Sequence, residues 1–271
     1  MKNCLFYATT LSALFVITAG CGSTKEKALY ANTENLDDLR SITRGNTETV
    51  ELTGIRFAAL RDTAMSLGAR GGLSWRAKQI NTRVDNYIRP LERIYNFNTL
   101  LLDENVLPPV LLEGRNTLEQ SSTDMLRIAD RSYIIQNQAR FVTTVPTWRD
   151  YLTLMYNKPE MPDRSLLPKT LEERTVWDKY IQQGWQAGIL QADAIFTESL
   201  GKLKRDYEGM VRYRSLLAQG IVSAPYVAKL DLGITGNANE MSVNDRILRI
   251  TVMPTFQMDS SQWKTQLVPL S

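Results

Sequence analysis

The side chains that could carry out covalent or acid–base chemistry are few in this 271-residue chain. It has two cysteines, Cys4 and Cys21, and no histidine. Serine–histidine and cysteine–histidine catalytic pairs are therefore excluded, and so are zinc sites built on histidine or cysteine ligands. Carboxylate-based catalysis remains open on residue count alone.

Three glutamates are candidate acids: Glu113, which precedes a Gly-Arg dipeptide, and the adjacent Glu172 and Glu173. A carboxyl of raised pKa at one of them could protonate a leaving group, as in a hydrolase that cuts the cell wall. A surface ion pair is the simpler interpretation of Glu113. Glu173 fits a helix-capping role, and no pair of carboxylates stands at a suitable spacing.

The thiol of Cys21 is a candidate because of what precedes it. Met1-Lys2-Asn3 carries one positive charge, and an apolar run from Cys4 to Ile17 follows. That run is shorter than the roughly 20 apolar residues of a permanent membrane anchor. Together with the small residues Ala19-Gly20 it describes a secretory signal peptide. We therefore expect residues 1–20 to be cleaved.

The cleavage site resembles the lipobox of bacterial lipoproteins, in which a cysteine is alkylated with diacylglycerol and becomes the mature N-terminus. Ala19-Gly20-Cys21 fits this pattern, whereas Thr18 stands where an aliphatic residue is usual. The alternative is an ordinary signal peptide followed by a cysteine by chance. We predict lipidation at Cys21, which leaves no second cysteine for a disulfide. We expect no other cofactor and no metal site.

The amino-acid composition limits the class of protein to which the chain can belong. The 32 basic and 29 acidic side chains give a net charge of +3, without the basic excess typical of a nucleic-acid binder. The hydrophobic fraction of 43% indicates a globular protein. Residues 21–50 are polar, and we expect a lipidated N-terminus followed by a flexible tether. Residues 51–271, which hold no second run of membrane-spanning length, are expected to form one domain.

Helical periodicity marks the first part of this domain. It predicts a helix from residue 51 that is interrupted at Gly71-Gly72, a second over 73–88 and a short one over 90–101. The glycines near the interruption lack the spacing of a phosphate-binding loop. They indicate a hinge or a tight helix contact.

The middle of the chain is less regular. Residues 105–116 contain a proline pair and predict an extended segment or an edge strand. Residues 126–144 predict a strand pair or an extended stretch. Thr147 and Asp150 mark a helix entry, and the three prolines within 157–168 predict a loop.

The strongest periodic signal follows. Thr170 and Glu173 form a capping box, and apolar residues then recur at steps of three and four, which predicts a helix from 171 to about 219 that ends at Gly220. Such a helix would be about 70 Å long. We expect it either to break near Gly201 or Gly209 or to present part of its apolar face to a partner.

Two further glycines of this helix, Gly184 and Gly188, stand one turn apart. They could allow a close helix contact, although simple core packing is favoured. After Gly220 the period switches to two, which predicts strands over 226–234 and 241–253 joined by a loop at 235–239. Asn244-Asp245 is a candidate second turn. The fold class is therefore α+β, a helix-rich single domain with a long helix and a small antiparallel hairpin.

Several short motifs between residues 52 and 253 carry a family resemblance: Leu60-Arg61-Asp62-Thr63-Ala64, Asn105-Val106-Leu107-Pro108-Pro109-Val110, Val145-Pro146-Thr147-Trp148-Arg149-Asp150-Tyr151-Leu152, Leu167-Pro168-Lys169-Thr170, Leu203-Lys204-Arg205-Asp206-Tyr207, Ser223-Ala224-Pro225-Tyr226-Val227 and Asn244-Asp245-Arg246-Ile247-Leu248-Arg249-Ile250-Thr251. In this order they resemble DotC, the lipoprotein of the type IVB (Dot/Icm) secretion system, whose counterpart in IncI-type conjugative plasmids is called TraI. The opening residues favour the conjugative version.

The resemblance implies an outer-membrane lipoprotein in the core complex of a machine that spans the cell envelope. It implies work with a DotD-type lipoprotein and with a DotH-type subunit, which the protein helps to reach the outer membrane. It implies no catalytic, cofactor or metal residue and no direct contact with nucleic acid. Gly22 is consistent with outer-membrane sorting, because Asp at that position favours inner-membrane retention in many Gram-negative lipoproteins.

We therefore expect a non-enzymatic scaffold whose copies associate in a ring, with its body facing the periplasm or embedded in the envelope complex. The long helix and the sheet edge of residues 226–253 are the expected protein-contact surfaces. One rival is a periplasmic hydrolase that cuts peptidoglycan with Glu113, Glu172 or Glu173. Another is a free periplasmic binding protein, for which Cys21 would be superfluous.

Overall fold

The computed structural model describes residues 35–42 and 54–264. The expected signal peptide 1–20, Cys21 and most of the expected tether lie outside these residues. The helices are α2 (Leu36–Ser41), α3 (Gly54–Asp85), α4 (Ile88–Ile94), α5 (Trp148–Leu152) and α6 (Leu171–Ala218). The strands are β1 (Val106–Leu107), β2 (Val110–Ser122), β3 (Met125–Asn137), β4 (Arg140–Phe141), β5 (Tyr226–Asn237) and β6 (Glu240–Val252).

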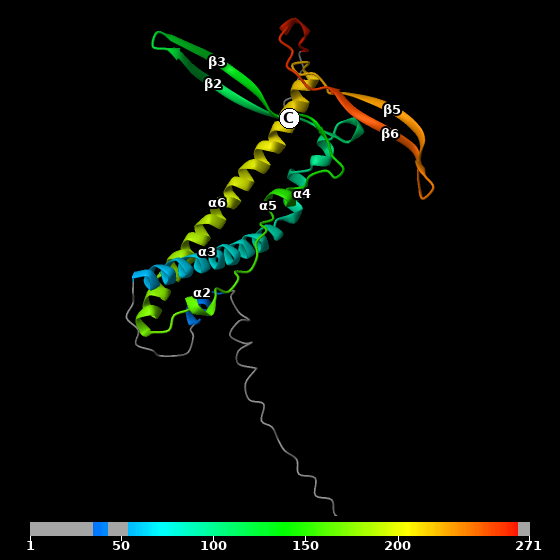
Figure 1. Ribbon diagram of the computed structural model, residues 1–271. Coiled ribbons are helices and arrows are strands. Elements are labelled where there is room, and N and C mark those ends of the chain that lie inside the picture. Colours follow the sequence, from blue (N-terminus) through cyan, green and yellow to red (C-terminus); the bar gives the residue numbers. More distant parts are fainter. Residues whose placement is uncertain (1–34, 43–53, 265–271) are drawn as a thin grey trace, which may run out of the picture.

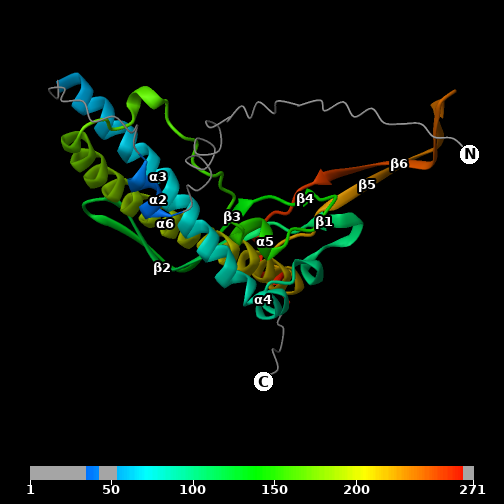
Figure 2. The ribbon, with the colours of Figure 1, turned by 90° about the horizontal axis from the view of Figure 1, so that it is seen from below.

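Helix α6 runs the length of the molecule, with α3 beside its first half and two β-hairpins at its C-terminal end (Figure 1). Seen along a perpendicular direction, α3 and α6 still lie side by side, and hairpin β5–β6 extends away from them (Figure 2). Each of the three sheets among the described residues has two antiparallel strands, in the orders β1-β4, β2-β3 and β5-β6. The expectation of a helix-rich α+β domain is confirmed.

The limits of α6 follow from its end residues. The Thr170 hydroxyl accepts a hydrogen bond from the Glu173 backbone N–H at 3.1 Å, and Gly220 adopts a left-handed conformation with φ +71°. These are the predicted cap and stop. The expected break is absent, because α6 continues for 48 residues through Gly201 and Gly209.

Glycines bring α3 and α6 into backbone contact. A Cβ built on Gly188 would lie 2.1 Å from the Ala69 carbonyl oxygen, and one built on Gly72 would lie 2.2 Å from the Trp185 carbonyl oxygen. Distances of this kind leave room only for a hydrogen atom. The glycines of both helices therefore interlock, and the simple core packing favoured for Gly184 and Gly188 is replaced by a close helix contact.

The predicted interruption at Gly71-Gly72 is also wrong, since α3 is one helix of 32 residues. The helix-breaking tendency of the two glycines is weak, about 1 kcal/mol each relative to alanine. Close packing against α6 offsets it. The alternative of a tight helix contact, which the sequence left open, is confirmed.

Helix α2 shows that part of the expected flexible tether is folded. Leu39 is fully buried, Ile42 is 4% exposed, and the indole N–H of Trp177 donates to the Leu39 carbonyl oxygen at 3.1 Å. Residues 36–42 are therefore part of the folded body although they lie within 21–50. Two apolar side chains, Leu39 and Ile42, are enough to dock this short helix against α3 and α6.

Hairpin β2–β3 decides between the alternatives for the middle of the chain. The extended stretch predicted for residues 126–144 is confirmed by strand β3, whereas a strand pair within these residues is not observed, because β3 pairs with the upstream strand β2. Strand β2 covers much of segment 105–116, for which an extended segment or an edge strand is predicted. Pro108 and Pro109 separate β2 from β1, since proline has no N–H for a strand ladder. The short strand β1 pairs instead with β4.

Hairpin β5–β6 has the predicted strands but a shorter turn, at Ala238-Asn239. Asn244 does not form a second turn. It lies inside β6 with φ +58°, near Gly233 of β5 with φ +74°, where the register of the two strands shifts. This irregularity is a bulge, which bends the hairpin.

The remaining expectations concern short elements. The predicted helix 90–101 is divided into α4 and a 3₁₀ turn at Phe97–Leu100, whose start is capped by the Asn96 side chain at 3.2 Å. The helix entry at Thr147 is confirmed as the start of α5. The segment 157–168 is a loop as predicted, with one 3₁₀ turn at Arg164–Leu166.

The apolar core lies along α6 in three clusters. The first surrounds Trp177 and Ile181 between α2, α3 and α6. The second joins Leu203 to Phe97 and Trp148, and the third joins Tyr213 to the base of β2. None of the helices in the described part of the chain combines the length and apolarity needed to cross a membrane.

Candidate functional site

The sequence-predicted site residues fall into two groups. Cys21 lies outside the described residues. Glu113, Glu172 and Glu173 all lie within them, so their surroundings can be compared with what a catalytic acid needs.

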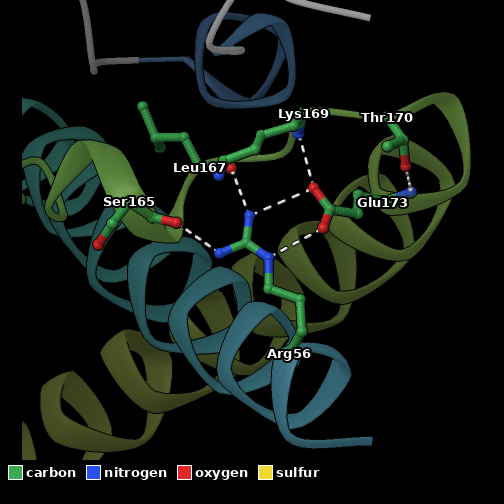
Figure 3. Close-up of polar contacts among 6 residues, drawn as sticks. All are labelled: Arg56, Ser165, Leu167, Lys169, Thr170 and Glu173. Atoms are coloured by element: carbon green, nitrogen blue, oxygen red, sulfur yellow. Dashed lines mark hydrogen bonds and ion pairs between the residues drawn. The ribbon is translucent and has the colours of Figure 1, made fainter. Parts of the chain in front are cut away.

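Glu173 is buried in an ion-paired cluster at the start of α6, with 3% of its surface exposed. Arg56 of α3 donates to it twice, from Nε at 2.8 Å and from Nη2 at 3.2 Å, as Figure 3 shows. The backbone N–H of Lys169 donates to the same carboxylate at 2.7 Å. Arg56 also donates to the carbonyl oxygens of Ser165 and Leu167. The cluster therefore fastens the loop before α6 to α3.

Two opposing effects act on this carboxyl. Burial raises the pKa of Glu173, but the hydrogen bonds from Arg56 and from the Lys169 N–H lower it more, and the net pKa is below its ordinary value. Glu173 is thus held as a carboxylate. Its neighbour Glu172 lies exposed on the first turn of α6.

Glu113 forms a second ion-paired cluster at the base of hairpin β2–β3. Arg115 and Arg212 each donate to it from Nε at 3.2 Å, and Arg212 also donates to the Leu111 carbonyl oxygen at 2.7 Å. The hydrogen bond from Arg115 lowers the pKa of Glu113. The expected ion pair is confirmed, although it is more enclosed than a surface pair, since 12% of the Glu113 side chain is exposed.

The two clusters lie at opposite ends of α6. Arg212, which contacts Glu113, is 39 residues beyond Glu173 on the helix, a separation of about 58 Å at 1.5 Å per residue. Paired carboxylates of glycoside hydrolases stand about 5–10 Å apart. Glu113 and Glu173 do not form such a pair, and both carry a lowered rather than a raised pKa.

A cavity of about 610 Å³ opens where β2, α5 and α6 meet. Residues of three separate sequence motifs line it, among them Pro108, Tyr151 and Asp206. The Tyr151 hydroxyl donates to Asp206 Oδ2 at 3.3 Å, and Arg205 Nε lies 3.5 Å from Asp206 Oδ1. Stretches that stand far apart in the sequence therefore converge on one wall beside the base of hairpin β2–β3.

Comparison with known protein families identifies the family to which this chain belongs. Residues 54–265 match the family described as type IV secretory system, conjugal DNA-protein transfer. The chain belongs to this family. Among curated proteins, no match to the chain is found.

The match covers α3 to α6 and both long hairpins of this type IV secretion protein. Type IV secretion and conjugation, which the resemblance of its motifs implied, are thereby established as its context.

The polar pair in the cavity of this type IV secretion protein is hydrogen-bonded within the chain. Burial, with Asp206 nearby, raises the pKa of Tyr151 to about 12, and its hydroxyl donates to Asp206. Among the described residues no group of three or more Asp, Glu, His or Cys side chains could hold a metal ion.

Sequence reasoning missed Arg56, Tyr151 and Asp206. Asp206 had a detectable signal, because it interrupts the apolar stripe of α6 between Leu203 and Met210, and a charged residue at a core position needs a partner. Arg56 gave no such signal, since its partner Glu173 lies 117 residues away.

Proposed function

We propose that this type IV secretion protein is an outer-membrane lipoprotein of the DotC type. In this proposal the diacylglycerol on Cys21 anchors the chain, and the body acts as a non-enzymatic scaffold of the core complex. It binds a DotD-type lipoprotein and a DotH-type subunit, which it helps to localise and assemble, and it makes no direct contact with nucleic acid.

The observation that carries the proposal is the family match over residues 54–265, read together with the lipobox-like Ala19-Gly20-Cys21. The match supplies the conjugal-transfer system, and the cysteine supplies a means of attachment. Stable membrane anchoring takes more than one acyl chain, which a lipoprotein N-terminus provides.

The geometry of the carboxylates favours a scaffold over the rival hydrolase. A general acid for glycosidic cleavage needs a raised pKa, whereas Glu113 and Glu173 both have lowered values and serve as anchors for arginines. A zymogram with purified protein separates the two functions. We expect no clearing of peptidoglycan, and a cleared band that disappears in Glu113→Gln would overturn the scaffold proposal.

The anchor is tested by Cys21→Ser in a strain that lacks the wild-type gene. We expect the variant to leave the outer-membrane fraction and conjugal transfer to fall by at least tenfold. Cys4→Ser is the matched control, because Cys4 lies within the expected signal peptide, and it should behave as wild type. Unchanged outer-membrane association of Cys21→Ser would contradict the lipoprotein assignment.

The partners are tested by affinity purification of the full-length chain from envelopes of cells that express the transfer system. We expect the DotD-type and DotH-type subunits to co-purify. Loss of the chain should also leave the DotH-type subunit outside the outer-membrane fraction. If that subunit reaches the outer membrane without the chain, the proposed assembly role is wrong.

A further inference from the structure

Another cavity of about 610 Å³ opens on the side of α3, where the loop between α5 and α6 crosses this helix. Three basic side chains line it, from Lys78 and Arg83 of α3 and from Lys158 of the loop. In the described part of the chain no aspartate or glutamate is among its lining residues. The cavity therefore concentrates positive charge in a protein whose net charge is only +3.

The loop is fixed across α3 on both sides of Lys158. The side-chain amide of Asn81 donates to the Leu154 carbonyl oxygen at 3.0 Å, and the Leu154 backbone N–H donates back to Asn81 Oδ1 at 3.1 Å. Pro159, which directly follows Lys158, is buried. The fold therefore keeps the basic side chains of helix and loop around one cavity.

An adjoining cavity of about 460 Å³ extends this surface and shares Lys158 with the first. It adds Arg70 of α3 and a single carboxylate, Glu160. Among the described residues, the two cavities are thus lined by four basic side chains and one acidic one. We call the surface around Arg70, Lys78, Arg83 and Lys158 the basic face.

Aromatic and apolar side chains accompany these charges. Trp75 and Tyr156, which are both half-buried, line the first cavity. Met155, the residue before Tyr156, is 95% exposed. Tryptophan and tyrosine are enriched where proteins meet lipid headgroups, because each ring has an apolar body and a polar edge. Clustered lysine and arginine attract anionic lipids. The basic face combines both features.

The chain that follows the predicted lipidation site arrives at this face. Asn35, the residue before α2, lines the first cavity, and the buried Leu39 docks α2 on the body. Cys21 stands 14 residues before Asn35, which limits their separation to about 46 Å at 3.3 Å per residue. A lipid on Cys21 would hold the basic face near the membrane, whereas the hairpins lie at the C-terminal end of α6 (Figure 1).

We propose that the basic face binds the phosphate headgroups of anionic phospholipids in the membrane that holds the lipid of Cys21. Lysine and arginine donate charge-assisted hydrogen bonds to phosphate oxygens. The first cavity, at about 610 Å³, has the size of a small-ligand site, about 300–1,000 Å³. The inference rests on the proposed function, because the lipidated cysteine brings this face to the membrane.

This second contact would define how the body is oriented. The lipid of Cys21 attaches one point of the chain, and one point of attachment does not define a direction. A headgroup contact through α3 and the loop adds a second point, so α3 lies against the membrane. The direction of α6 then follows, because its glycines interlock with those of α3.

Vesicle co-sedimentation tests the site with the mature chain, residues 21–271, carrying Cys21→Ser. This chain keeps every described residue and cannot carry a lipid of its own. We expect it to bind vesicles of phosphatidylcholine with phosphatidylglycerol roughly tenfold or more tightly than vesicles of phosphatidylcholine alone. High ionic strength should weaken this preference, because salt screens the attraction. Equal binding to both kinds of vesicle would overturn the inference.

A pair of variants locates the contact. Lys78→Gln with Arg83→Gln should weaken binding to the anionic vesicles by about 25-fold, since each basic side chain at an anionic surface contributes about fivefold. Lys204→Gln with Arg249→Gln removes the same charge from exposed positions elsewhere and should bind like the unsubstituted chain. All four side chains are exposed, so both variants should keep its Tm. Equal weakening in the two variants would contradict a site on the basic face.

Inorganic phosphate distinguishes a lipid headgroup from a free anion. Calorimetric titration of the same chain with inorganic phosphate at constant ionic strength should show much weaker binding than the anionic vesicles. Tight binding of phosphate without a preference for anionic vesicles would overturn the membrane contact. The fractionation of Cys21→Ser described above tests only the anchor. A lipidated chain that reaches the outer membrane, but whose unlipidated form ignores anionic vesicles, would therefore sink only the headgroup site.

Discussion

The two ends of α6 solve the problem of apolar surface in opposite ways. At the first end, α3 lies so close that glycines replace side chains, and Leu39, Trp177 and Ile181 are buried. At the other end, two hairpins extend outward with aliphatic residues exposed. The first end is completed by its own chain. At the second end, apolar side chains of the hairpins such as Leu118 and Ile234 stay more than half exposed.

This difference between the two ends of α6 predicts which positions should tolerate substitution. In the helical pair a single methyl group meets backbone atoms that cannot move independently. In the outer part of the hairpins a side chain such as Leu118 is 65% exposed and belongs to none of the core clusters of the described residues. Substitutions at the two ends should therefore differ in the free energy of unfolding, and the following experiments test that contrast.

Gly188→Ala should have the largest effect. The new Cβ would lie 2.1 Å from the Ala69 carbonyl oxygen and 2.7 Å from the Leu73 backbone nitrogen, so the helices must separate. We expect a loss of about 3 kcal/mol or more, at the upper end of overpacking effects, and a fall in Tm of about 6–12 °C for a chain of this size. Thermal unfolding followed by circular dichroism measures it. A Tm within 2 °C of wild type, on the order of the shift from a 1 kcal/mol change, would refute the close contact.

Glu173→Gln should have the next largest effect, because it leaves Arg56 facing a neutral side chain. Removing one partner of a buried ion pair costs about 3–5 kcal/mol. We expect about 2–3 kcal/mol, since 22% of the Arg56 side chain is exposed. Denaturant titration at pH 7 measures the loss.

Glu173→Gln should also make the free energy of unfolding depend less on pH in the acidic range. The pKa of folded Glu173 lies below its ordinary value of 4.5, so its contribution is complete above pH 4.5 and is lost as pH falls through the folded pKa. The wild type should therefore lose stability faster than Glu173→Gln on acidification below pH 4.5. Parallel profiles would show that the carboxylate is not held by Arg56.

Gly201→Ala should have a smaller effect of opposite sign. A Cβ at Gly201 meets nothing within 4 Å, and alanine is favoured over glycine inside a helix by about 0.8–1.0 kcal/mol. We expect the free energy of unfolding to rise by that amount. The experiment pairs with Gly188→Ala on the same helix, and a loss of stability in Gly201→Ala as well would contradict the open space at Gly201.

Leu118→Lys should have the smallest effect on the fold. Exposed positions usually change stability by less than about 0.5 kcal/mol, and Leu118 is 65% exposed. We expect the variant to unfold at the same denaturant concentration as the wild type. A loss above 1 kcal/mol would mean that the hairpin packs on its own body.

The sequence predicted the elements that local signals define. Thr170 with Glu173 and the apolar steps of three and four located α6, and the period of two located β5 and β6. It did not predict that Gly71 and Gly72 lie within one continuous helix, because glycine's weak local preference is overridden there by packing against the distant helix α6. At Gly201 a Cβ would meet nothing within 4 Å, so α6 continues through this glycine without such packing.

Hairpin β2–β3 and the ion-paired clusters escaped prediction for a related reason. The proline pair 108–109 indicated an extended segment or an edge strand, and β2 begins directly after it, but the pairing of β2 with β3 was not predicted. Arg56 with Glu173 and Arg212 with Glu113 join residues about a hundred positions apart, and one sequence does not reveal such partners. The fold class needed only periodicity, and the site needed the tertiary structure.

The unbroken course of α6 gives the molecule a mechanical property. Its 48 residues form a rod of about 72 Å, held at the start by the Arg56 cluster and attached at the end to both hairpins. A rod without a hinge transmits rotation as displacement, so a tilt of about 5° at the first end moves the far end by about 6 Å at that length. Any reorientation of α6 where α2 and α3 contact it would therefore also displace both hairpins at the far end of the rod.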